Sequence, residues 1–83
     1  MENKIEKTVK QYKESYKVSK RVNTNLTFDV YIKTVALSHP KIINGDIFDE
    51  AFPEIMADLR ADIKEMGLPA IYKKVKQDYK ESA

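Results

Sequence analysis

The feature that most constrains the fold is an apolar stripe with helical spacing between residues 47 and 66. Its members are Phe48, Phe52, Ile55, Met56, Leu59, Ile63 and Met66. On a helix these side chains fall within an arc of about 100°, which is typical of a helix that packs one face on a core. Asp46 is the N-cap candidate, and Gly67 is placed to end the segment. Pro53 predicts either a kink or a second helix that begins after a short turn at 47–51.

Two further segments repeat this pattern and flank the central one. In residues 2–21 the apolar stripe consists of Ile5, Val9, Tyr12 and Tyr16; in residues 69–81 one face carries Leu68, Ile71, Tyr72, Val75 and Tyr79. Lysines occupy much of the remaining surface of both segments, and lysine is a good helix former. Both segments are therefore predicted to be helices, and the three residues Gly67 to Pro69 force a tight corner between the last two.

Residues 26–38 satisfy two patterns at once. As a helix, the segment carries apolar residues on two sides and would sit in the centre of a bundle, with Thr24, Asn25 or Thr27 as its cap. As a strand, residues 26–33 alternate apolar and polar side chains. The Asn44-Gly45 pair is a strong hairpin signal that would supply partner strands. The helical neighbours favour the helix.

Together the segments predict an all-α fold, a compact three- to four-helix bundle, formed by a single helical domain over residues 1–83. The alternative is an α+β fold with 26–33 as a strand. The predicted core consists of Ile5, Val9, Tyr12, Tyr16, Phe28, Ile32, Val35, Leu37, Phe52, Ile55, Leu59, Ile63, Ile71 and Val75. The first apolar seam is long for so small a bundle, so a homodimer is an alternative way to cover it.

Charge is segregated along the chain, although the net charge is only +2. Residues 1–22 carry seven basic and three acidic groups, whereas residues 44–66 carry two basic and seven acidic groups. Basic helices thus flank one acidic helix. One interpretation is internal pairing between neighbouring helices, in which each exposed ion pair adds about 0–1 kcal/mol. The other is that the acidic and basic faces are separate docking surfaces that attract partners of opposite charge.

Two sets of residues follow from the second interpretation. The acidic, partner-binding set is Glu50, Glu54, Asp58 and Asp62, spaced four residues apart. The basic set would contact nucleic acid and contains Lys10, Lys13, Lys17, Lys20, Arg21, Lys73, Lys74, Lys76 and Lys80. Tyrosines lie between these lysines in sequence, but helical spacing puts the rings on the apolar stripes. A row of carboxylates alone does not make a metal site, so no metal and no cofactor are predicted.

The sequence contains no set of residues that predicts catalysis. It has no cysteine, one histidine, and no phosphate-binding or nucleophile motif, so the protein is expected not to be an enzyme. The absence of cysteine and of a long apolar run predicts a cytoplasmic protein with no membrane partner.

The expected function is that of a small helical interaction protein, a regulator or inhibitor that docks on a larger protein. A composition rich in lysine, isoleucine and asparagine is typical of low-GC bacteria and their phages, which suggests a phage or mobile-element origin. The alternative is a small nucleic-acid-binding module with basic faces.

Overall fold

The structure is a computed structural model that describes residues 3–81, and within this range it contains helices and no strands. The four longer helices are α1 (Lys4–Val22), α2 (Phe28–Ser38), α5 (Pro53–Met66) and α6 (Leu68–Glu81). Two helices of four residues, α3 (Pro40–Ile43) and α4 (Phe48–Ala51), lie between α2 and α5. The all-α class is confirmed, and the alternative strand at 26–33 and hairpin at 42–48 are wrong.

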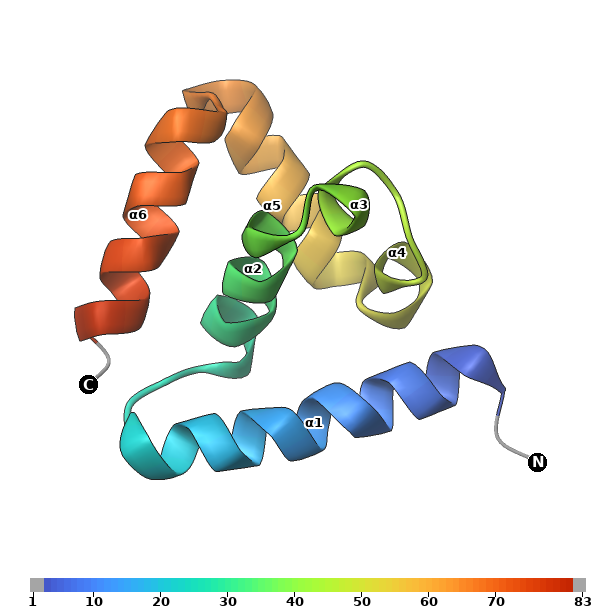
Figure 1. The fold of residues 1–83 in the computed structure, drawn as a ribbon. Coiled ribbons are helices and arrows are strands. Elements are labelled where there is room, and N and C mark those ends of the chain that lie inside the picture. The colour runs from blue at the N-terminus through green and yellow to red at the C-terminus, as the bar shows by residue number, and fades with distance from the viewer. Residues whose placement is uncertain (1–2, 82–83) are drawn as a thin grey trace.

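The arrangement of the helices explains why residues 26–38 are helical. α5 and α6 form a V, and α2 lies between its arms, where it contacts both (Figure 1). α1 crosses the open end of the V and packs on α2 and α4 (Figure 1). A helix in the position of α2 needs apolar residues on two sides, and this requirement makes its pattern resemble that of a strand.

The helix ends follow local chemistry. The hydroxyl of Thr27 accepts a hydrogen bond from the N–H of Val30 and caps α2. Pro53 begins α5 after a bend at Phe52. Of the two alternatives predicted for this proline, the structure therefore has a second helix after a short turn, and not a kinked helix. Gly67 ends α5 with a φ of +86°, in the left-handed region that favours glycine, and donates its N–H to Ile63 O. Asp46 is not the N-cap predicted for this region: α4 begins after Ile47, and the Asp46 carboxylate instead accepts the N–H of Ile47.

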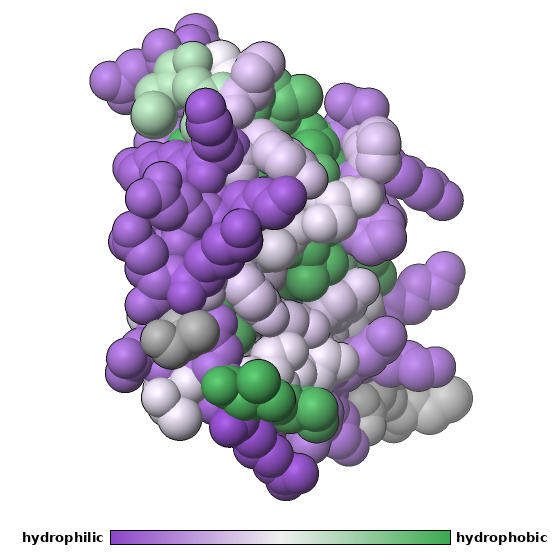
Figure 2. All heavy atoms as spheres, turned by 60° about the vertical axis from the view of Figure 1, so that its left-hand side comes forward, coloured by the Kyte–Doolittle hydropathy of each residue, from purple (hydrophilic) through white to green (hydrophobic). Residues whose placement is uncertain are grey.

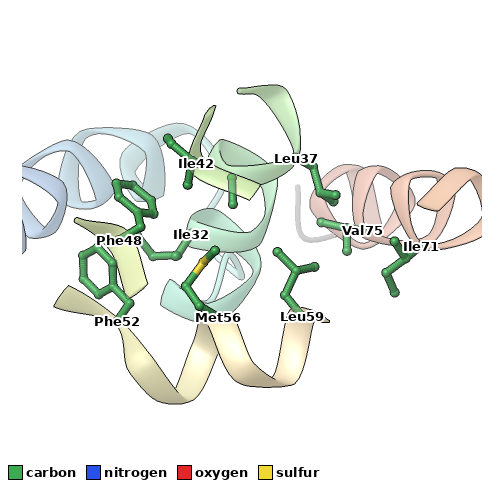
Figure 3. Close-up of a cluster of buried hydrophobic side chains, with 10 residues drawn as sticks. Ile32, Leu37, Ile42, Phe48, Phe52, Met56, Leu59, Ile71 and Val75 are labelled. Carbon is green, nitrogen blue, oxygen red and sulfur yellow. The ribbon is translucent and has the colours of Figure 1, made fainter. Parts of the chain in front are cut away.

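The core lies where α2, α4, α5 and α6 meet (Figure 3). Its buried side chains are Ile32, Ala36, Leu37, Ile42, Phe48, Phe52, Met56, Leu59, Ile71 and Val75. Six of these were predicted from the sequence. Leu26, Ala36, Ile42, Phe48 and Met56 are buried although the predicted core did not include them.

The longest helix contributes least to the core. α1 has no fully buried residue, and Ile5, Val9, Tyr12 and Tyr16, all predicted to be core, are only partly buried. It docks mainly through its two tyrosines. The Tyr12 ring lies edge-on to Phe48 at 4.7 Å, and the Tyr16 hydroxyl donates to Leu26 O at 2.6 Å. Burial, with Tyr31 and Asp46 nearby, raises the pKa of Tyr12.

Candidate docking surfaces

The acidic residues selected from the sequence do not form one row on one helix. Glu50 lies on α4, whereas Glu54, Asp58 and Asp62 follow one another on α5 beyond the bend at Phe52. Glu50, Glu54 and Asp58 are exposed, and Asp62 is partly buried. The structure therefore keeps three of the four carboxylates at helical spacing and moves the first onto a separate element.

Asp58 is the member of this set that is tied to another helix. Its carboxylate accepts a hydrogen bond from Lys33 Nζ on α2 at 2.5 Å, and the Lys33 side chain is only 16% exposed. The hydrogen bond and charge of Lys33, helped by the charge of Lys74 on α6, lower the pKa of Asp58. This part of the acidic surface thus holds α2 against α5, as the internal interpretation predicts.

A second ion pair ties the short helices to α5. The Arg60 guanidinium pairs with Asp49 of α4 and also donates to Ile43 O, at the end of α3, at 3.0 Å. One side chain on α5 therefore fixes both short helices. Among residues 3–81 no ion pair is recorded for Glu50, Glu54 or Asp62, so these three members of the predicted acidic set are available for a partner.

The predicted basic residues are exposed on two helices. Lys10, Lys13, Lys17, Lys20 and Arg21 lie on α1, and Lys73, Lys74, Lys76 and Lys80 lie on α6. Two of them stand over tyrosine rings: Lys20 Nζ lies 5.6 Å from the centre of the Tyr16 ring, and Lys76 Nζ lies 5.9 Å from that of Tyr72. Lys17 pairs with Glu14 on the same helix at 3.4 Å.

The ring of Tyr72 is more exposed than its spacing in the sequence predicted. Its position on the apolar stripe of the last helix predicted a packed ring, yet it is 45% exposed. Tyr72 and Lys76 line one groove together with Thr34 and Leu37 of α2. An aromatic ring and a cation therefore face the same groove, an arrangement that helical spacing did not favour.

The end of α1 forms a further groove that the sequence analysis missed. Val18 and Val22, which are 61% and 88% exposed, line it together with Tyr79 and Lys80 of α6. The signal in the sequence was their spacing of four residues, on a side of the helix away from the apolar stripe. Figure 2 shows apolar side chains on this face of the molecule, among hydrophilic ones.

No group of three or more histidine, cysteine or acidic side chains in the described part of the chain is arranged to hold a metal ion. Within the same range, none of the helices has the length and apolar character needed to cross a membrane. Comparison with protein-family models, with curated proteins and with solved structures found no match to this chain.

Proposed function

We propose that this chain is a small non-enzymatic regulator or inhibitor that acts by binding a larger protein through the acidic surface of α4 and α5. The observation that carries the proposal is the exposure of Glu50 and Glu54, with Asp62 about two turns beyond Glu54 on α5, all three without recorded ion pairs in residues 3–81. Uncompensated carboxylates attract a basic surface, and such complementarity raises association rates and selects the partner. We propose the cytoplasm as the place of action, because a chain without cysteine gains nothing from an oxidising compartment.

The test reverses the three available carboxylates and leaves Asp58 in place, because Asp58 holds α2 to α5. The variant is Glu50→Lys, Glu54→Lys, Asp62→Lys. The control, Glu6→Lys, Glu14→Lys, Glu81→Lys, makes the same change in net charge at exposed positions on α1 and α6. A partner captured by the wild type is identified by mass spectrometry, and its affinity is then measured with purified proteins. We expect at least a tenfold loss for the first variant and a smaller loss for the control; equal affinities would contradict the assignment.

A second candidate function is binding of single-stranded nucleic acid. It is favoured by Tyr72 and Lys76, because a ring and a cation in one groove suit base stacking and phosphate contact. Fluorescence anisotropy with a labelled oligonucleotide at increasing salt tests it. Binding is expected to weaken with a log–log slope of about −0.7 per phosphate contacted. Tyr72→Ala is expected to weaken it further, and no binding at low salt rejects this function.

A further inference from the structure

The two most exposed large apolar side chains lie together at the C-terminal end of α1. Val22 is 88% exposed and Val18 is 61% exposed, and they line a groove of about 560 Å³ that also receives Tyr79 and Lys80 from α6. When a partner covers aliphatic side chains this exposed, their removal from water favours binding. Nothing within residues 3–81 covers them.

Asn23 also lines this groove and joins its two sides. The residue is 5% exposed, and its Nδ2 donates to Tyr79 O at 2.9 Å, which ties the end of α1 to the end of α6. Its Oδ1 is buried and has no hydrogen-bond partner. Buried carbonyl oxygens are nearly always paired, so Asn23 Oδ1 is an exception within residues 3–81.

A second, smaller groove of about 130 Å³ lies between α6 and α2, on the side of α6 that also borders the first groove. Leu37 and Val75 form its apolar wall, and Tyr72 and Lys76 form its rim. Tyr72 and Tyr79 are seven residues apart, so the two grooves are separated by two turns, or about 10 Å along α6. In Figure 2, a strip of weakly polar and apolar side chains runs along this face between hydrophilic borders.

The charge along this side of α6 has one sign. Lys73, Lys76 and Lys80 follow one another at spacings of three and four residues, whereas Asp78 projects from the opposite side of the helix. Arg21 extends the positive charge onto α1, one position from Val22. A partner that fills both grooves therefore lies alongside a row of positively charged side chains.

We propose that the two grooves form a single docking site for an acidic amphipathic helix of another protein. Two apolar side chains of that helix, seven residues apart, fill the grooves at Val22 and at Leu37. Carboxylates between them pair with Lys76 and Lys80. Helices are bound in this way when apolar anchors at regular spacing enter a groove and charged residues set the partner. The site is separate from the acidic surface of α4 and α5, so it does not depend on the function proposed above.

The probe is a fluorescein-labelled helical peptide with two leucines seven positions apart, glutamates on both sides of the leucine line and alanines elsewhere. Anisotropy measures its binding to the full chain. We expect saturable binding that falls at least tenfold in Val18→Ser, Val22→Ser and, separately, in Lys76→Glu, Lys80→Glu. The control Lys4→Glu, Lys7→Glu makes the same charge change at the other end of α1 and is expected to change affinity less than threefold. The reversal of Glu50, Glu54 and Asp62 is expected not to weaken binding.

Three results would overturn the proposal. The first is no saturable binding by wild-type protein that is folded by circular dichroism. The second is equal binding of a peptide with serine in place of both leucines, which would show attraction by charge alone. The third is a wild-type dimer in light scattering that becomes monomeric in the valine variant, which would assign the groove to a second copy of the chain. Because the valines and lysines are exposed, their variants retain the core contacts and report on binding.

Discussion

At the scale of single residues, Asp58 stabilises the fold although its position in the sequence pattern predicted a surface residue available to a partner. The Lys33 side chain is only 16% exposed, and its ammonium pairs with the Asp58 carboxylate. An ion pair of this kind lowers the pKa of the carboxyl group because it favours the charged form. The same contact therefore links the stability of the fold to pH.

We predict that Asp58→Asn lowers the free energy of unfolding by up to about 1 kcal/mol at pH 7, because Lys33 loses its partner. The pKa of Asp58 is lowered from 3.8, so the stabilisation is present above that value and is lost as the pH falls through the native pKa. Urea unfolding at pH 7 and at about pH 2.5 measures this difference.

The wild type and Asp58→Asn are expected to converge at the lower pH. Glu65→Gln is the matched control, because it neutralises an exposed carboxylate on the same helix. It is expected to change stability by less than about 0.5 kcal/mol at either pH. A difference between wild type and Asp58→Asn that is the same at both pH values would show that the ion pair is not its source.

At the scale of elements, α3 and α4 are too short to be stable by themselves, since four residues form only about one helical turn. Their buried side chains, Ile42 and Phe48, pack in the core, and Arg60 holds both helices to α5. Both short helices therefore depend on contacts made by one side chain, Arg60.

We predict that Arg60→Lys destabilises the protein by about 1–2 kcal/mol. Lysine keeps the charge but lacks the planar fork that reaches Asp49 and Ile43 O together. Lys64→Arg, one turn later on an exposed position of α5, is the control and is expected to be neutral. Thermal unfolding of both variants measures the effect, and equal midpoints would contradict the role given to Arg60.

The sequence was sufficient for three of the four longer helices, favoured a helix over a strand for α2, and was insufficient for their assembly. Periodicity, Gly67 and Pro53 located α1, α5 and α6, because these signals act within a few residues of the backbone they shape. The burial of Ile42 and of Ala36 depends instead on which helices pack together, and local sequence signals do not determine that packing. The exposure of Val22 and Tyr72 was missed for the same reason, since residue type alone does not reveal what covers a side chain.

At the scale of the whole molecule, burial is uneven. α2, α5 and α6 supply most of the shared core, whereas α1 crosses its edge and buries no residue completely. Regions with few buried contacts open locally at a lower free energy than the core. The stability of α1 is therefore expected to be lower than that of the V formed by α5 and α6.

Native-state hydrogen exchange tests this division. Amide hydrogens in α1 are expected to exchange through local openings, at least tenfold faster than those in the middle of α2 and α5. Those in α2 and α5 are expected to exchange only on global unfolding. Tyr16→Phe, which removes the hydrogen bond to Leu26 O, is expected to speed exchange further in α1 and to leave α5 unchanged. Uniform protection across all four longer helices would contradict the prediction.

The joint between α5 and α6 has a consequence for how the length of this chain can vary. Gly67 alone separates two helices of 14 residues each, so α6 has no slack with which to absorb an added residue. One residue inserted into the first turn of α6 would rotate the rest of that helix by about 100° about its axis. Ile71 and Val75 would then leave the core, and the lysine side of α6 would turn with them. Insertion or deletion of a residue at this joint is therefore incompatible with the fold.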